Sequence, residues 1–237
     1  MRVMPQLFSA AVIVLAVGAC AKEQSEGTPK QDSAAPAMMG SAEYTVVLKS
    51  KWTPTNHPFE YPKANPLTGP HFSGLIGASH NETYSIFQEG ALPTPGLERL
   101  SEEGKHTPLD EEIKAAIASD KAGMLYETGA LRDFSDSLVT TVRVDDAHPL
   151  ISLVAMVAPS PDWFTGVANV NLMENGAWAA SRTLDLIAFD SGGDDGTTYK
   201  AADKDNNPKK PTSKASTPHF VINGVTVPVG SVTFIKK

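Results

Sequence analysis

The chain has 237 residues, 18 glycines, 18 prolines and one cysteine, and its formal net charge at pH 7 is -7. This acidic balance argues against nucleic acid as a partner, because phosphate binding needs Lys and Arg clustered on one face. The nearest basic group, Lys209, Lys210 and Lys214, is interrupted by proline and is predicted to be a solvated loop. A single cysteine excludes a disulfide within the chain.

Residues 1–19 have the pattern of a secretion signal, with Arg2 as the positive charge and an apolar core over residues 7–17. The core is too short for a stable membrane span. Small residues directly before Cys20 resemble a bacterial lipoprotein signal, which predicts that Cys20 is acylated and that the lipid contacts the membrane. The alternative is an ordinary signal with an incidental cysteine. Ala21 resembles the sorting signal for the outer membrane of Gram-negative bacteria, so we expect a cell-envelope location.

Residues 20–42 are predicted to be a flexible linker that begins with the lipidated Cys20. Glu, Gln, Ser, Gly, Pro, Lys and Ala dominate this segment, and no apolar periodicity would let it bury enough surface to fold. A random coil of this length spans about 25 Å. Residues 43–237 are long enough to form one sizeable domain.

The pattern inside the domain is mostly that of β-strands. Apolar residues alternate over residues 44–48 and 138–144, which favours strands with one buried face. Residues 150–157 are almost all apolar, which predicts a central strand covered on both faces. The pairs Asn175-Gly176 and Asn223-Gly224 each lie between two strand-like runs, and both predict hairpins with type I′ turns.

One helix is clearly indicated before Gly123. Thr107 is predicted to be its N-cap and Pro108 its first residue, with acidic residues in the first turn. A shorter helical turn is expected between Gly96 and Glu103, inside a stretch that glycine and proline make mostly loop. The predicted fold is therefore all-β, with long loops and one or two short helices.

Two acidic stretches each follow a strand-like run. The first is residues 159–163, Pro-Ser-Pro-Asp-Trp, and the second is residues 190–196, Asp-Ser-Gly-Gly-Asp-Asp-Gly. Closely spaced aspartates separated by glycine let a loop present several hard oxygen ligands, as Ca²⁺ requires. The alternative is a solvated turn, in which Gly supplies a positive φ and Asp caps its own backbone. Trp163 is expected to pack beneath the metal loop, with contact to a ligand at the rim as the alternative.

Three blocks together resemble the spondin domain, the N-terminal F-spondin module of extracellular matrix proteins. They are His71–Asn81, Pro159–Gly166 and Asp190–Gly196, and the resemblance extends over roughly 190 residues, from Tyr44 to Phe234. It implies an antiparallel β-sandwich resembling a C2 domain. It also implies that three loop aspartates hold calcium, and by motif position these are Asp162, Asp190 and Asp194. Asp195 stands where the family usually has Ser. Adhesion in the matrix or at the cell surface is the implied function, with glycosaminoglycans as one ligand class.

We therefore expect a non-enzymatic calcium-binding module on a lipid tether, which binds an extracytoplasmic protein or glycan whose identity stays open. The sequence has no Gly-x-Ser-x-Gly elbow and no His-x-x-x-His metal spacing. A calcium-dependent hydrolase is the alternative, with Asp195, His80 or Glu82 as its base. A third possibility is membrane docking through the calcium loops, for which Phe164 would be an apolar tip.

Overall fold

The structure is a computed structural model that describes residues 40–65, 68–134 and 137–237. The predicted signal, Cys20 and most of the predicted linker lie outside these residues. β1 begins at Ser41, so the last two residues of the predicted linker belong to the first strand.

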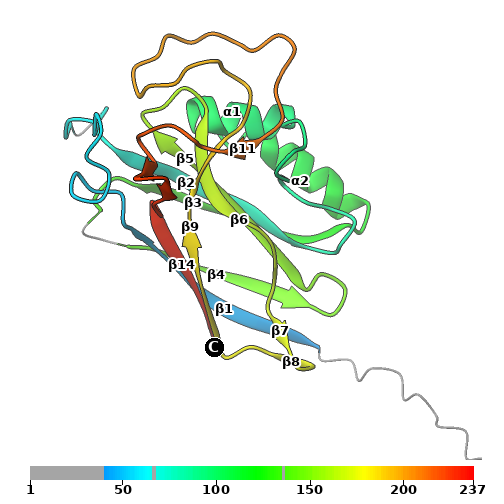
Figure 1. The fold of residues 1–237 in the computed structure, drawn as a ribbon. Coiled ribbons are helices and arrows are strands. Elements are labelled where there is room, and N and C mark those ends of the chain that lie inside the picture. The colour runs from blue at the N-terminus through cyan, green and yellow to red at the C-terminus, as the bar shows by residue number, and fades with distance from the viewer. Residues whose placement is uncertain (1–39, 66–67, 135–136) are drawn as a thin grey trace, which may run out of the picture. The chain divides into compact units, whose positions relative to one another are not determined.

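The described chain forms an antiparallel β-sandwich of two main sheets (Figure 1). The four-stranded sheet has the order β4 (Ser137–Asp145), β1 (Ser41–Ser50), β14 (Gly230–Lys236) and β9 (Ser181–Leu186). The six-stranded sheet has the order β11 (Ser213–Lys214), β10 (Ala188–Asp190), β6 (Trp163–Asn171), β5 (Leu150–Ala158), β2 (His71–His80) and β3 (Ala122–Leu131). The predicted all-β sandwich is confirmed.

The main core lies between the two sheets. Val46 and Leu48 of β1 alternate with outward-facing residues and join Leu153 and Val157 of β5 in one buried cluster. Side chains on one face of a strand repeat every second residue, so the alternation in the sequence specifies which face of β1 is buried.

A second core lies on the other face of the six-stranded sheet, which helices α1 (Pro95–Glu103) and α2 (Leu109–Ala118) cover (Figure 1). Leu100 of α1 and Ile113 of α2 pack in one cluster with Ile76, Val154 and Phe164 of the sheet. β5 therefore contributes alternate residues to both cores. This explains why all nine of its residues are buried, and it confirms the predicted central strand.

Close backbone contacts bring β2 against both of its neighbours. A Cβ at Gly74 would lie 2.0 Å from the Thr128 carbonyl oxygen, and one at Gly77 would lie 2.0 Å from the Ser152 carbonyl oxygen. No side chain fits at either position, so glycine is required there for a packing reason rather than for a turn.

Both Asn-Gly hairpins are confirmed. The first joins β7 (Met173–Glu174) to β8 (Ala177–Trp178), and the second joins β12 (Val221–Ile222) to β13 (Val225–Thr226). In each turn both central residues have positive φ, between 51° and 78°, as a type I′ turn requires.

The helix boundaries correct two details of the sequence interpretation. Pro108, rather than Thr107, occupies the N-cap of α2, and no side chain there accepts a capping hydrogen bond. The helical turn expected between Gly96 and Glu103 is present as helix α1, which begins one residue earlier, at Pro95, with Thr94 as its N-cap and Gly104 as its left-handed C-cap. Proline often occupies the first position of a helix and glycine often follows its last position, so these residues can mark the ends of a helix as well as a loop.

The chain changes sheets between β9 and β10. β9 pairs with β14 in the four-stranded sheet, and β10 pairs with β6 in the other. Asp190, the last residue of β10, lies opposite Trp163, the first residue of β6. This antiparallel register brings the start of β6 and the end of β10 to the same end of the sandwich. The long loop after β10 forms the top of the domain in Figure 1.

Candidate metal centre

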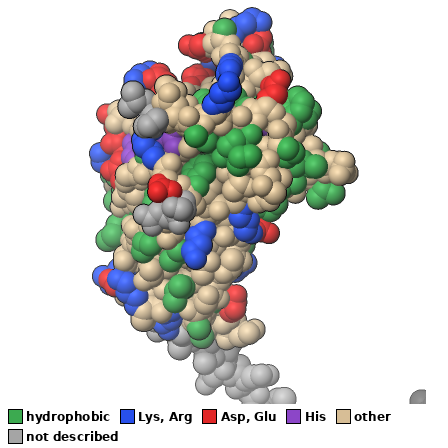
Figure 2. All heavy atoms as spheres, turned by 90° about the vertical axis from the view of Figure 1, so that its left-hand side faces the viewer, with side chains coloured by type: hydrophobic (Ala, Val, Ile, Leu, Met, Phe, Trp, Pro, Cys, Tyr) green, Lys and Arg blue, Asp and Glu red, His purple; other side chains and the backbone are tan. Residues whose placement is uncertain are grey.

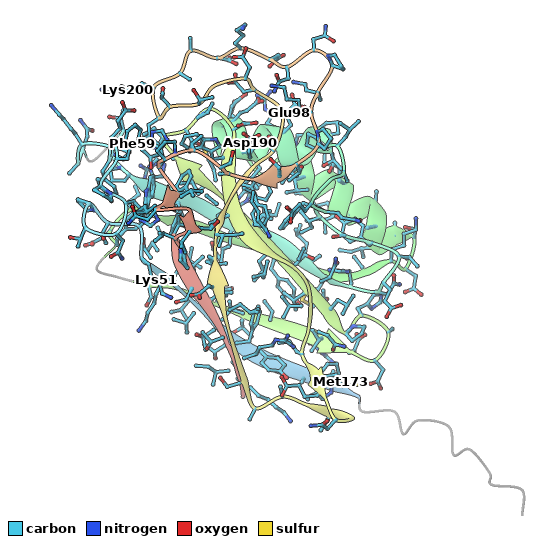
Figure 3. All side chains as sticks on the ribbon, viewed as in Figure 1. Lys51, Phe59, Glu98, Met173, Asp190 and Lys200 are labelled. Carbon is cyan, nitrogen blue, oxygen red and sulfur yellow. The ribbon has the colours of Figure 1, made fainter. Side chains whose placement is uncertain are left out.

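The two acidic stretches meet at one end of the six-stranded sheet. The first, residues 159–163, leads into β6, and the second, residues 190–196, begins the loop after β10. The Ser191 N–H donates to the Asp162 carbonyl oxygen at 3.2 Å, which joins the two stretches through their backbones. Figure 3 shows Asp190 and Glu98 at this end of the domain and Met173 near the opposite end. The convergence that was expected from sequence is therefore present.

Asp162 is the buried centre of this arrangement, with none of its surface exposed. Its Oδ2 accepts three hydrogen bonds, from Ser191 Oγ at 2.9 Å, from Gly192 N at 3.0 Å and from Asp194 N at 3.1 Å. Its Oδ1 is buried without a hydrogen-bond partner among the described residues. Burial raises the pKa of Asp162, while the three donors act in the opposite direction.

Asp190 approaches Asp162 through a shared donor. Gly192 N donates to Asp190 Oδ1 at 2.9 Å as well as to Asp162 Oδ2 at 3.0 Å, so the two oxygens can be no further apart than the sum of these bonds. Burial first, and then the charge of Asp162, raise the pKa of Asp190 to about 6. Two carboxylates held this close repel each other unless a cation or a proton is shared between them.

Asp194 forms hydrogen bonds within the loop after β10. Its Oδ1 accepts from Gly196 N at 2.6 Å and its Oδ2 accepts from Lys204 N, while Asn206 Nδ2 donates to its carbonyl oxygen at 2.6 Å. Each carboxylate oxygen keeps a second lone pair. Asp195 is different: its side chain is more exposed and pairs with the Lys204 ammonium.

Burial distinguishes this loop from a solvated turn. Residues 191–194 are all buried, and a Cβ at Gly192 would lie 2.1 Å from the Lys210 carbonyl oxygen. The oxygens gathered here are carboxylates and loop carbonyls, which is the donor set that Ca²⁺ prefers, and the unpartnered Asp162 Oδ1 is free to bind an ion. The burial of this loop therefore fits a defined site better than a surface turn, and Asp162, Asp190 and Asp194 are the residues that would hold calcium there.

Sequence reasoning missed a second acidic group, on α1 and in the long loop. Carboxylate oxygens of Glu98, Glu102 and Asp205 lie within 4.8 Å of one another. Lys209 Nζ lies among them, 2.7 Å from Glu98 Oε1 and 3.2 Å from the Gly193 carbonyl oxygen. The spacing of Glu98 and Glu102, four residues apart on one helix face, was the available signal. Figure 2 shows basic and acidic side chains gathered at this upper end.

The aromatic residues next to Asp162 are packed inside. Trp163 is fully buried and contacts Tyr199, His219 and Phe220 with ring centroids 5.0 to 5.4 Å apart, so the prediction that this side chain packs inside rather than at a ligand-binding rim is confirmed. Phe164 is also fully buried, against Phe189 and the helices. The third possibility, in which Phe164 is an apolar tip for membrane docking, is wrong, because β6 turns this side chain toward the second core.

Two of the three bases considered for a hydrolase lie at the wrong end of the sheet. His71 of β2 pairs with Ala158, next to the metal loop, whereas His80 pairs with Leu150 at the far end of β5. Nine residues of strand separate the two ends, which is about 30 Å. His80 is fully buried, with its Nε2 2.7 Å from Ser152 Oγ, and Glu82 lies beyond it. Neither can act on a substrate held at Asp162.

The chain is similar to a family of known proteins. The Spondin_N family model matches residues 42–220. Spondin-2 of Rattus norvegicus is 29% identical over 205 residues, which are 82% of this chain and 62% of that protein. Spondin-2 of Homo sapiens is 31% identical over 161 residues, 68% of this chain and 48% of that protein. Spondin-1 of Homo sapiens is 29% identical over 179 residues, 73% of this chain and 21% of that protein.

The chain thus spans less than two thirds of the length of each of these relatives. Neither helix in the described residues is long and apolar enough to cross a bilayer.

Proposed function

The chain belongs to the Spondin_N family, and from this we propose that it is a non-enzymatic extracytoplasmic module that binds Ca²⁺ through Asp162, Asp190 and Asp194. The bound ion holds the loops at the end of the sandwich in one arrangement. These loops are the surface that meets an adhesion partner, either a protein or a glycan. Acylation of Cys20 holds the module to the outer membrane. The family supports the extracytoplasmic, non-enzymatic part of this proposal.

One observation carries the calcium assignment. Asp162 is completely buried, its Oδ2 has three donors, and its Oδ1 has none among the described residues. Burying a carboxylate oxygen without a donor costs several kcal/mol, so such an oxygen in a folded protein normally has an ion or a water as its partner. Asp190 beside it makes a divalent cation the better partner, because the ion also removes the repulsion between the two carboxylates.

The test is calorimetric titration of the full chain with CaCl2, together with thermal melting. At a calcium concentration 100 times Kd, binding should stabilise the domain by about 2.7 kcal/mol, and chelation should remove this gain. Asp162→Asn should lose binding, and Mg²⁺ should substitute poorly because it demands a small octahedral shell. The absence of calcium binding at millimolar concentration would overturn the assignment.

The tether and the partner need separate measurements. Cys20→Ser should release the protein from the membrane fraction or block its processing, and unchanged fractionation would contradict acylation. A pull-down from cell-envelope extract in calcium and in EDTA tests the adhesion role. A partner retained only in calcium supports it, whereas a partner retained equally in both shows that the calcium loops are not the binding surface.

A further inference from the structure

A hollow of about 1100 Å³ lies beside the loop after β10, and no function has yet been given to it. Residues from the 58–65 segment form one wall, and Pro159 with residues 198–200 forms the other. Figure 3 marks this side of the domain with the labels of Phe59 and Lys200. A hollow of this size can hold a small molecule or a short segment of another chain.

The hollow has two lysines in excess, one on each wall. Lys63 and Lys200 are exposed, and neither ammonium has a hydrogen-bond or ion-pair partner in the part of the chain that the structure describes. Lys209 of the same long loop, in contrast, pairs with a glutamate. Glu60 also lines the hollow, but its Oε2 lies 3.4 Å from Nε2 of the buried His219, which holds this carboxylate on the core side. Two unpaired cations at one hollow favour a ligand with negative charges.

The walls below these lysines are largely apolar. Pro58, Pro62 and Pro159 line the hollow, and proline has no backbone N–H to donate. The hydroxyl of Tyr61 already donates to a backbone carbonyl at 2.9 Å. Phe59, which follows Pro58, is 44% exposed, and Figure 2 faces this side and shows hydrophobic side chains next to basic ones. Sugar hydroxyls need hydrogen-bond partners that such walls supply poorly, so the walls favour the apolar side chains of a protein over a glycan.

We propose that this hollow binds an acidic segment of a partner protein, whose carboxylates pair with Lys63 and Lys200 and whose apolar side chains contact the prolines. The inference rests on the proposed adhesion role, because it names the partner's chemistry and the place where it binds. It does not require the calcium ion as a ligand. Tyr199 at the base of the hollow packs against Trp163 with ring centroids 5.4 Å apart, so the bound segment lies beside the calcium loop.

The test is fluorescence anisotropy of a labelled peptide that alternates Glu with Leu, titrated with the full chain in EDTA. Lys63→Glu and Lys200→Glu should each weaken binding about fivefold or more, because each removes an ion pair and adds a repulsive charge. Lys121→Glu is the matched control: Lys121 is also exposed and unpaired in the described chain, but it precedes β3 at the end of the sheet where His80 lies. It should change the affinity by less than about twofold. Melting temperatures of the three variants check that each is folded.

Two further ligands test the chemistry of the partner. A peptide that alternates Glu with Ser should bind more weakly than the Glu-Leu peptide, because it has no apolar side chains for the prolines. Polygalacturonate, an acidic glycan, should compete poorly. Equal binding of polygalacturonate, no binding of the Glu-Leu peptide at millimolar concentration, or equal losses in all three lysine variants would overturn the inference. Because the titration is made in EDTA, a failed calcium assignment leaves it unaffected. A partner that the envelope pull-down captures equally with Lys63→Glu and Lys200→Glu would overturn the hollow as its site and leave the adhesion role in place.

Discussion

The exposed Asn-Gly hairpins and the buried loop after β10 contain the same turn-forming residue types, but different surroundings require their glycines. A Cβ at Gly176 or Gly224 would meet nothing within 4 Å, so those glycines serve only the positive φ of the turn. Gly192 has a φ of 87°, and a Cβ there would also lie 2.1 Å from the Lys210 carbonyl oxygen. A glycine in an exposed turn is a backbone requirement, whereas a glycine in the buried loop also leaves space for other groups to converge.

The largest expected difference between the two kinds of turn is in their tolerance of alanine. Gly192→Ala adds a backbone clash to the strain of positive φ, and should reduce the free energy of unfolding by about 3 kcal/mol or more. Gly224→Ala has only the strain, about 1 kcal/mol. Urea denaturation of both variants measures the difference. Equal losses would show that the loop after β10 relaxes as freely as an exposed hairpin.

The hairpins themselves allow a sharper test of the φ requirement. Gly176→Val puts a β-branched residue at a φ of 75° and should reduce the free energy of unfolding by about 1 to 2 kcal/mol. Gly129 of β3 is the matched control, because a Cβ there also meets nothing within 4 Å and its φ is not positive. Gly129→Val should be tolerated. Similar losses for both would mean that the side chain, rather than the backbone conformation, causes the effect.

The buried carboxylate of Asp190, at the end of β10, predicts how the free energy of unfolding depends on pH when EDTA keeps calcium away. Burial raises the pKa of Asp190 from 3.8 to about 6, so between these pH values the native state holds a proton that the unfolded state has released. The contribution of Asp190 to stability therefore rises as the pH falls. From pH 7 to pH 5 the unmodified chain should gain about 1 kcal/mol relative to Asp190→Asn.

The comparison with Asp190→Asn is needed because buried histidines act in the opposite direction. Burial lowers the pKa of His57, His80 and His219, so the unfolded chain takes up their protons first and stability falls as the pH drops below about 6.5. Both proteins share this loss, and the difference between their urea midpoints isolates Asp190. A difference that does not change with pH would contradict the buried carboxylate.

Local patterns predicted the parts of the fold that depend on neighbours in the sequence. The uninterrupted apolar run predicted the central β5, and Asn-Gly predicted both hairpins, because in each case the residues themselves carry the physical requirement. Helix α1 was expected only as a short helical turn inside a loop, because Pro95 and Gly104 were taken as loop residues rather than as its two ends. Phe164 was misplaced because which side of β6 is covered by helices depends on tertiary packing.

The site was predictable only in part, for the same reason. Asp162 and Asp190 were brought together by resemblance to a family, and the register of β6 with β10 explains why they meet. Glu102 comes from a helix 60 residues before Asp162, and no local pattern connects the two. It reaches the loop because α1 packs on the six-stranded sheet and because Gly193 leaves room for its carboxylate.

The smallest expected effect belongs to Asp195, whose side chain lies near the surface of the loop after β10. Its carboxylate bonds to the Lys204 ammonium near the surface, where an ion pair contributes less than about 1 kcal/mol because water screens it. Asp195→Asn should therefore change the free energy of unfolding by less than about 0.5 kcal/mol and the calcium affinity by less than about twofold. Asp190→Asn, at the last residue of β10, should weaken calcium binding by at least about tenfold.

Asp195→Asn and Asp190→Asn each remove one negative charge from the same end of the sandwich, so a general electrostatic effect would weaken calcium binding by both variants alike. Titration of the two with CaCl2 at low and at moderate ionic strength separates these cases, since salt screens a diffuse field but not a direct ligand. Equal losses that salt abolishes would mean that the acidic loop attracts calcium without binding it at a defined centre.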